Sequence, residues 1–472
     1  MNRRRFVKQS SWVAAGIMLA PHVFAAGTAE FPTVRTAEKK RKFRSKAVDK
    51  LIADMKKNIG NKELAWMFEN CFPNTLDTTV DFEMLGGKPD TYVITGDIDA
   101  MWLRDSSAQV WPYLPLCKED KELQNMIKGL IARQAKCIIK DPYANAFYKN
   151  DDKLSEWHKD MTQMQRGIHE RKWEVDSLCY PIRLAYGYWE ATGDTTVFDE
   201  QWFMAMANVV KTFKEQQRFN GNGPYSFMRK SAINTDTGPM GGFGNPAKPN
   251  GLICSVFRPS DDATIFPYLI PANFFAMHAL LQLTIIAGNV KNGLDVKEID
   301  AMIKQISNGL AKHAKVKTEQ YGEVYAYEVN GFGSFNLMDD ANVPSLLSLE
   351  YLIPLMKDDK VWQNTRRYVL SADNPYYFKG KVGEGIGGPH VGADYIWPIS
   401  IIMRGLTAND DKEIKACIQM LQSTHAGKGF MHEAFHKDDA NKFTRPWFAW
   451  ANSLFGEFIW KVYRERPHLL KA

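Results

Sequence analysis

Residues 120–139 read DKELQNMIKGLIARQAKCII, and this stretch sets the interpretation of the whole chain. Its apolar side chains recur at positions i, i+3, i+4, i+7 and i+8, namely Leu123, Met126, Ile127, Leu130 and Ile131. This spacing places them on one face of an α-helix and leaves the charged residues on the other. The stretch therefore predicts an amphipathic helix.

The same period recurs along the chain from residue 36 onward. It predicts helices near residues 46–58, 62–70, 105–116, 120–139, 173–192, 197–217, 263–287, 296–313, 340–356, 359–370, 393–405, 410–425 and 446–464. Strand-like alternation is confined to short pieces such as Thr91–Thr95 and Glu323–Val329. No repeat of about 20–50 residues is visible, which argues against a solenoid. The pattern predicts an all-α protein.

No linker or change of composition separates these segments, so we expect one catalytic domain over residues 27–472. About a dozen helices can pair as six hairpins and close into an (α/α)6 barrel, a toroid whose loops collect at one end. Long Gly/Pro-rich stretches at residues 219–251 and 379–392 are predicted to form the active-site face.

Residues 1–26 have the three parts of an export signal. A basic start, Arg3-Arg4-Arg5-Phe6-Val7-Lys8, is followed by the apolar run Trp12–Ala20 and by small residues around Ala25. The basic start is similar to the twin-arginine consensus, which predicts export of the folded protein to the periplasm or beyond. An uncleaved amphipathic anchor is the alternative interpretation. No later stretch reaches about 18 uninterrupted apolar residues, so we expect no membrane contact once the signal is removed.

Charge and cysteine content exclude other classes of protein. The net charge of the 472 residues is +6, and the predicted signal accounts for four of these charges, so the rest carries no electrostatic footprint for nucleic acid. The cysteines are widely spaced without a CxxC pair. They are predicted to be buried small residues, with one or two disulfides as the alternative; they are Cys71, Cys117, Cys137, Cys179, Cys254 and Cys417.

Acidic residues gather in aromatic, Gly/Pro-punctuated segments before predicted helices. Thr95–Ser107 contains Asp97, Trp102, Arg104 and Asp105. Carboxylates and arginine can bind vicinal sugar hydroxyls, and tryptophan can cover an apolar sugar face. Helix capping by Asp105, paired with Arg104, is the alternative.

Phe257–Thr264 is a second such segment, with Asp261 and Asp262 side by side. Adjacent carboxyl groups can differ in environment, so that one binds as an anion while the other keeps its proton. Simple N-capping is the alternative. Leu337–Pro344 and Trp173–Asp176 repeat the arrangement, and one shared pocket explains all of these segments together.

His432-Glu433-Ala434-Phe435-His436 matches the H-E-x-x-H pattern of zinc peptidases. That motif requires a helix, but Gly427 and Gly429 precede it and no apolar period follows, so Glu433 is predicted to act as a base or a hydrogen-bonding group in a loop. A zinc peptidase remains the least favoured alternative. The segment His390–Trp397, which includes Asp394, is predicted to form another sugar-binding rim, unless His390 only caps a turn.

Five segments in this order, Thr95–Ser107, Phe257–Thr264, Met338–Ser345, His390–Trp397 and Met431–Phe435, resemble glycoside hydrolase family 125, the metal-independent exo-α-1,6-mannosidases. The resemblance spans about residues 35–465. It implies an (α/α)6 barrel, removal of a terminal non-reducing α-1,6-linked mannose from an oligosaccharide or N-glycan, inversion at the anomeric carbon, and no metal or other cofactor.

The resemblance also implies roles for individual residues. The general acid is an aspartate in Arg258–Asp262, for which we favour Asp261 and keep Asp262 as the alternative. The general base is Glu433. An inverting pair should stand roughly 6.5–9.5 Å apart, with room for a water molecule. The remaining candidates are expected to bind the terminal mannose, with Trp102 or Trp397 as an apolar wall; they are Asp97, Trp102, Arg104, Asp105, Arg258, Asp262, His390 and Asp394.

Two other classes of protein stay open at this point. An exported sugar-binding module would use the same residues without chemistry, and another α/α-barrel glycosidase, for example one acting on α-glucosides, would share the fold. The sequence alone does not identify the glycan source or the oligomeric state.

Overall fold

The computed structural model describes residues 31–291 and 293–471. The predicted export signal, residues 1–26, therefore lies outside the described residues. The described residues from Val34 onward form one compact unit. The α-helices are α2 Lys46–Asn58, α3 Lys62–Cys71, α4 Asn74–Thr78, α5 Leu103–Val110, α6 Lys121–Lys140, α7 Val175–Thr192, α8 Glu200–Gln216, α9 Ile270–Asn289, α10 Val296–His313, α11 Leu349–Leu352, α12 Lys360–Val369, α13 Pro398–Leu406, α14 Asp411–Ser423 and α15 Ala449–Glu465.

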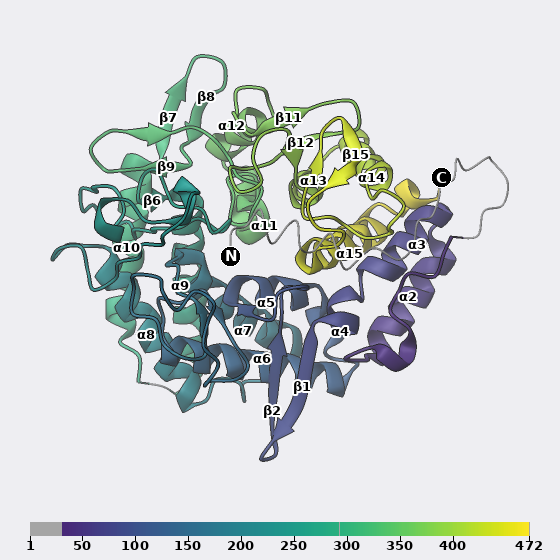
Figure 1. Ribbon diagram of the computed structural model, residues 1–472, viewed down its shortest axis with the longest axis horizontal. Coiled ribbons are helices and arrows are strands. Elements are labelled where there is room, and N and C mark those ends of the chain that lie inside the picture. The colour runs from purple at the N-terminus through teal and green to yellow at the C-terminus, as the bar shows by residue number, and fades with distance from the viewer. Residues whose placement is uncertain (1–30, 292, 472) are drawn as a thin grey trace. The chain divides into compact units, whose positions relative to one another are not determined.

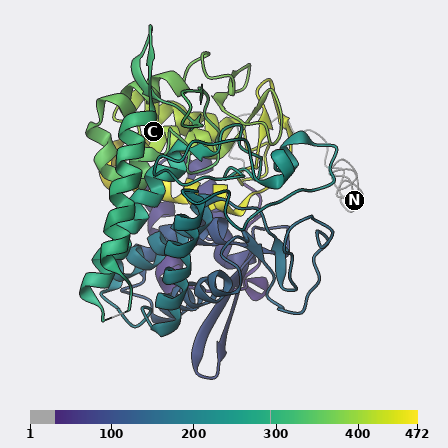
Figure 2. The same ribbon diagram turned by 90° about the vertical axis from the view of Figure 1, so that its left-hand side faces the viewer.

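The strands are short and antiparallel. The hairpin β1 Val80–Leu85 and β2 Lys88–Val93 projects from the helices (Figure 2). The other strands are β3 Met101–Trp102, β4 Ala146–Phe147, β5 Ile168–Glu170, β6 Tyr268–Leu269, β7 Lys315–Thr318, β8 Gly322–Tyr325, β9 Glu328–Val329, β10 Phe335–Asn336, β11 Tyr377–Lys379, β12 Glu384–Ile386, β13 Tyr395–Ile396, β14 Phe435–His436 and β15 Asp439–Phe443. Three three-stranded sheets, with strand orders β3-β4-β5, β10-β9-β6 and β13-β14-β15, tie together loops that are distant in sequence.

Local sequence explains where the amphipathic helices begin. Side chains at the N-cap accept a hydrogen bond from a backbone N–H of the first turn, which satisfies one of the free donors there. Asp120 caps α6, Asp199 caps α8 and Asp410 caps α14. The stretch 120–139 is therefore a helix, as its apolar period predicts.

The helices fall into a buried set and a set that covers it. Every residue of α5 and most of α7 are buried, whereas α6, α8 and α10 have one buried face. The buried helices pack in succession, α5 on α7 and α7 on α9, while α15 packs on both α13 and α5. Figure 1 shows this set nearer the middle, with α6, α8, α10, α12 and α14 outside it.

Three of the predicted helices are wrong in extent. Residues 263–269 are irregular and end in strand β6, so α9 begins only at Ile270, with Pro271 in its first turn. Most of residues 340–356 form a loop, in which only Leu349–Leu352 is α-helical. Residues 393–397 are a turn and strand β13, and α13 begins at Pro398. In all three places an irregular segment precedes the helix, so the acidic segments stand further from the helix starts than predicted.

One described helix, α9, is long and apolar enough to span a membrane by length and composition alone. Sixty-seven per cent of its most apolar window is buried within the fold, and it packs between α7 and α10. We interpret it as a core helix. The six cysteines are also buried, and none forms a disulfide, as the first of the two interpretations predicts.

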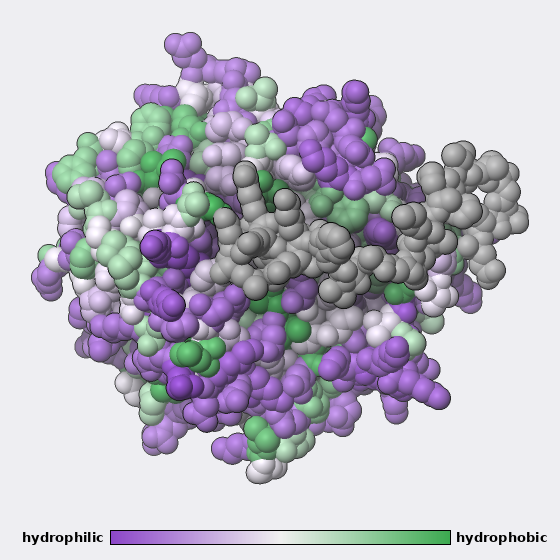
Figure 3. Space-filling model, viewed as in Figure 1, coloured by the Kyte–Doolittle hydropathy of each residue, from purple (hydrophilic) through white to green (hydrophobic). Residues whose placement is uncertain are grey.

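The long connections gather on one side. In the turned view the longest helices lie to the left and the irregular connections to the right (Figure 2). On the face shown in Figure 3, hydrophilic residues cover most of the lower half and the upper right. Hydrophobic residues concentrate at the upper left, over the part of the fold where Figure 1 places β6, β7 and β9.

Candidate active site

The predicted segments meet because each one precedes a buried helix. Thr95–Ser107 leads into α5, Phe257–Thr264 precedes α9, and Met431–Phe435 precedes α15. Met338–Ser345 stands before α11, and His390–Trp397 stands before α13. Since these helices pack side by side, the loops at their N-terminal ends come together.

Arg104, in the first turn of α5, is the central cation of the site. Its Nη1 donates to Glu174 Oε2 at 2.5 Å and lies 3.5 Å from Asp176 Oδ2. Its Nη2 lies 3.4 Å from Asp261 Oδ1, and its Nε lies 3.4 Å from Asp105 Oδ2. Burial raises the pKa of Asp105 to about 6, although Arg104 lowers it. One guanidinium therefore holds four carboxyl groups.

Asp261 sits at the tip of a tight turn with its backbone in the left-handed region, at φ 65°. Its N–H donates to the carbonyl of Arg258 at 2.9 Å, and its own carbonyl accepts from Lys172 Nζ at 2.8 Å. Its carboxyl group accepts from Asn145 Nδ2 at 3.4 Å and is 21% exposed. The turn thus aims a partly accessible carboxyl group at Arg104.

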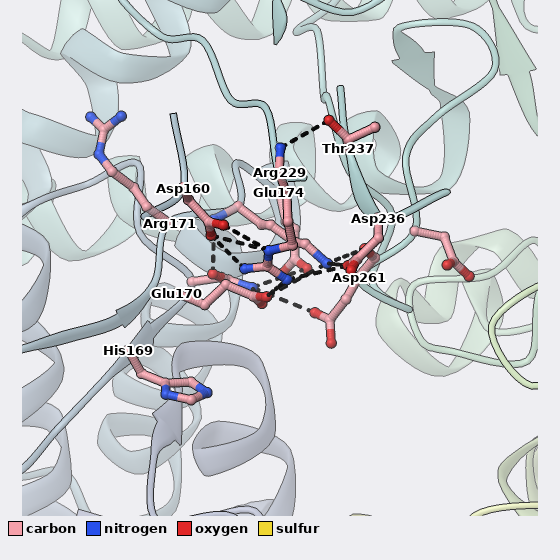
Figure 4. Close-up of polar contacts among 12 residues, drawn as sticks. Asp160, His169, Glu170, Arg171, Glu174, Arg229, Asp236, Thr237 and Asp261 are labelled. Carbon is pink, nitrogen blue, oxygen red and sulfur yellow. Dashed lines mark hydrogen bonds and ion pairs between the residues drawn. The ribbon is translucent and has the colours of Figure 1, made fainter. Parts of the chain in front are cut away.

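A buried network of charged side chains lies beside this turn (Figure 4). Lys172 Nζ donates to Asp236 Oδ1 at 2.8 Å, and Arg229 binds Asp160, Glu170 and Asp236. Asn145 connects the network to the turn, because its amide also reaches Glu170 Oε2 at 3.2 Å. Each buried charge here has a partner of opposite sign, as burial requires.

Asp262 faces away from this network, toward the loop of His390. Its Oδ2 lies 3.7 Å from His390 Nδ1. Burial raises the pKa of Asp262, but His390, Thr235 and the charge of Lys172 together outweigh burial and leave the pKa below its ordinary value. Arg258 Nε donates to Glu328 Oε1 at 2.7 Å, and the charge of Arg258 lowers the pKa of Asp340. Asp340 packs against Gly388, in the loop that also carries His390.

Glu433 is held on the third side of the site, next to the hairpin of β14 and β15. It accepts from Thr444 Oγ1 at 2.8 Å and from Arg445 Nη1 at 3.3 Å. Arg445 also pairs with Asp97, and its charge lowers the pKa of Asp105. Asp105 therefore stands between Arg104 and Arg445, and this chain of charges connects Asp261 with Glu433.

Two predicted binding residues lie in other environments. Trp102 belongs to strand β3 and packs in a small buried cluster with Ala100, Ala146 and Tyr148. Asp394 is 45% exposed and pairs with Lys437 Nζ at 2.6 Å. Trp397 is buried, with its ring 6.1 Å from that of His390.

The helical zinc motif does not form. His432 lies in an irregular segment that bends at Glu433, and His436 lies in strand β14, so the two histidines do not share the face of one helix. The His432 ring stacks on Phe443 at 4.0 Å, and its Nδ1 faces the backbone carbonyl oxygens of Arg445 and Pro446. Among residues 31–291 and 293–471, no three or more His, Cys, Asp or Glu side chains are arranged so that they could hold a metal ion. We therefore drop the zinc-peptidase alternative.

Sequence reasoning missed Asn145, Lys172 and Arg445 as parts of the site. None of them belongs to one of the five motifs, and the carboxyl groups that they bind are up to 348 residues away in sequence. Glu174 and Asp340 lie in acidic segments that the sequence does single out, but their roles depend on contacts across the fold.

Comparisons with known proteins give a consistent result. The family described as metal-independent alpha-mannosidase (GH125) matches residues 61–460. The meiotically up-regulated gene 157 protein of Schizosaccharomyces pombe is 41% identical over 469 residues, which cover 95% of this chain and 92% of that protein. A metal-independent alpha mannosidase of Streptococcus pneumoniae, solved as a non-productive complex with alpha-1,6-mannobiose, is 38% identical with a TM-score of 0.86 and covers 90% of this chain and 100% of its own.

Proposed function

Because this chain belongs to the metal-independent alpha-mannosidase family, glycoside hydrolase family 125, we propose that it removes terminal non-reducing α-1,6-linked mannose from oligosaccharides or N-glycans with inversion. The observation that carries this proposal is the pair of carboxyl groups, Asp261 and Glu433, at opposite ends of one network of charges. The pneumococcal relative supports the linkage, since its complex contains alpha-1,6-mannobiose.

Asp261 is the proposed general acid. It is the partly exposed carboxyl group of its turn, and Arg104 and Asn145 hold one of its oxygens. The environment of Asp262 suits an anion, because His390 lowers its pKa. This contrast supports Asp261 rather than Asp262.

Glu433 is the proposed general base. Thr444 and Arg445 bind its two oxygens and so fix the orientation of the carboxyl group. Two arginines and Asp105 lie on the route from Glu433 to Asp261. The presence of three side chains between Asp261 and Glu433 supports a separation of the two carboxyl groups that is wide enough for a water molecule, as an inverting mechanism requires.

In the proposed reaction, Asp261 gives its proton to the glycosidic oxygen while the bond from that oxygen to the anomeric carbon breaks. A water molecule attacks the anomeric carbon from the opposite face, and Glu433 accepts the proton that this water loses. The products are β-mannose and the shortened glycan.

The proposed sugar pocket is lined by polar atoms that are still available for hydrogen bonds. Within the described part of the chain, Arg258 Nη2, Asp340 Oδ2 and Trp397 Nε1 are buried without a hydrogen-bond partner. Together with Asp97, Asp105, Asp262 and His390 they can bind the hydroxyl groups of one terminal mannose. We propose that Trp102 and Asp394 lie at the edge of this sugar pocket. Trp102 is held there by its buried cluster, and Asp394 is held by its ion pair with Lys437.

We also propose that the helices close as an (α/α)6 barrel. The successive contacts of α5, α7 and α9, and the contact of α15 with both α13 and α5, support this closure.

We also propose that the protein is exported by the twin-arginine route, on the basis of Arg3-Arg4-Arg5-Phe6-Val7-Lys8. Cell fractionation of the double variant Arg3→Lys, Arg4→Lys tests this export route. Recovery of that variant from the periplasm would contradict export by the twin-arginine route.

The Glu433→Gln variant tests the proposed base. It should cleave α-1,6-mannobiose at least about 100-fold more slowly, because an amide cannot accept the proton of the attacking water. Binding of mannobiose, measured by calorimetry, should persist. Glu413→Gln is the matched control, since Glu413 pairs with Arg404 and Arg366 outside the site. A rate within about tenfold of the wild type would remove Glu433 from the base role.

A further inference from the structure

A second carboxyl group, that of Glu174, shares both donors of Asp261. Arg104 binds Glu174 Oε2 through Nη1 at 2.5 Å and Asp261 Oδ1 through Nη2 at 3.4 Å. The Asn145 amide nitrogen lies 3.4 Å from Glu174 Oε1 and 3.4 Å from Asp261 Oδ1. Figure 4 shows Glu174 and Asp261 in the same close-up of polar contacts. The two carboxyl groups are therefore held against each other.

Neither carboxyl group can easily move away. Glu174 precedes α7 and is completely buried, and Ser177 Oγ donates to its Oε2 at 2.8 Å. The turn of Asp261 is fixed at its carbonyl oxygen by Lys172 and at its N–H by Arg258. The fold thus imposes this proximity.

The charges around the pair do not balance two carboxylates. Arg104 is the cation in contact with both, and it also faces Asp105 and Asp176. Lys172 is engaged by Asp236 and Glu170, and His169 also interacts electrostatically with Asp261. Burial raises the pKa of Glu174 well above that of an ordinary glutamate, and Asp261 raises it further. Two carboxyl groups in contact, one fully buried and the other only 21% exposed, cannot both ionise at low cost.

We propose that Glu174 and Asp261 share one proton as a coupled pair, and that Glu174 thereby keeps Asp261 able to protonate the leaving glycosidic oxygen. This inference rests on the proposed function, in which Asp261 is the acid. When Asp261 gives up the proton, both carboxyl groups are anionic against Arg104 until a proton from solvent restores the pair. Glu174 is a positioning residue, because it acts through Asp261 and is too deeply buried to touch the sugar.

The pH profile of kcat/KM on α-1,6-mannobiose tests this pair. Its alkaline limb marks the loss of the shared proton. Glu174→Gln removes the like charge that opposes ionisation, so the limb should move to lower pH by at least about one unit. At a pH above both alkaline limbs, kcat/KM of Glu174→Gln should be lower than that of the wild type by about tenfold for each pH unit by which the limb has moved.

Ser177→Ala provides a second variant with the opposite sign and a minimal change of volume. It removes a donor that stabilises ionised Glu174, so the pair should keep its proton to higher pH by about half a unit. Asp90→Asn is the matched control, because it removes a buried carboxylate that binds Arg133 and Lys136 away from the site, and its alkaline limb should not move. An unmoved limb in either Glu174→Gln or Ser177→Ala, in folded protein, would overturn the pair.

Asp261→Asn separates this inference from the proposed function. It should lose cleavage of mannobiose but cleave dinitrophenyl α-mannoside, whose leaving group needs no protonation. Normal cleavage of mannobiose by Asp261→Asn would overturn the acid assignment and the pair together. The expected loss in Asp261→Asn, combined with an unmoved limb in Glu174→Gln, would overturn the pair alone.

Discussion

Arg104 is the residue on which most of the site's charge depends. It contacts Asp105, Glu174, Asp176 and Asp261, and its side chain is only 4% exposed. Removing a buried cation leaves its partners unpaired, which typically costs about 3–5 kcal/mol. The sequence predicts that Arg104 is a cation in the site, next to Asp105. That Arg104 also contacts Glu174, Asp176 and Asp261 follows only from the packing of the folded chain, such as that of α5 against α7.

His432 provides a test of residue-scale electrostatics. Burial lowers the pKa of its imidazole to about 4, from an ordinary value of 6.5. Stability from the neutral ring is therefore complete above pH 6.5 and is lost as the pH falls toward 4, by about 3 kcal/mol in total. Asn at this position keeps a donor for the backbone carbonyl groups but does not titrate.

Chemical unfolding at pH 7 and pH 4.5 checks this expectation. The His432→Asn variant should lose less free energy of unfolding between the two pH values than the wild type. His158→Asn, at an exposed histidine whose ring contacts the backbone carbonyl of Ser155, is the control for the change of side chain itself. An identical pH dependence in wild type and His432→Asn would contradict the buried neutral ring.

At the scale of elements, the period of the sequence predicts helices well where they are amphipathic and capped, such as α6 and α8. It fails at 263–269, 340–348 and 393–397, where apolar residues of buried loops imitate a helical period. Those loops are buried because they pack between helix ends, and a local pattern carries no information about such neighbours. The same reason explains why Asn145 and Arg445 were missed.

Gly456 tests the packing of α15 on the N-terminal helices. A Cβ at this position would lie 2.4 Å from the Phe72 ring and 3.0 Å from the Phe72 Cα. Gly456→Ala should therefore lower the free energy of unfolding by about 1–3 kcal/mol, because the overlap forces side chains or backbone to shift.

Gly288→Ala in α9 is the matched control for this substitution. Apart from its chain neighbours and the nearby backbone of its own helix, no heavy atom of the described residues lies within 4 Å of the added methyl group, so this variant should leave stability unchanged or raise it by up to about 1 kcal/mol. Equal denaturation midpoints for Gly456→Ala and the wild type would contradict the close packing of α15 against Phe72.

At the scale of the whole molecule, the family follows from motifs and not from composition. The charge and cysteine content exclude classes of protein without identifying a reaction. The five ordered segments identify the family because the fold brings the starts of its buried helices to one place, where we propose that residues far apart in sequence bind one sugar.

Proton NMR of α-1,6-mannobiose, incubated with the protein in EDTA, tests the central claim most directly. The anomeric signals from the first minutes report which product forms before mutarotation. A metal-independent inverting α-1,6-mannosidase releases β-mannose first. Initial release of α-mannose, or no cleavage until a metal ion is added, would contradict the proposed mechanism.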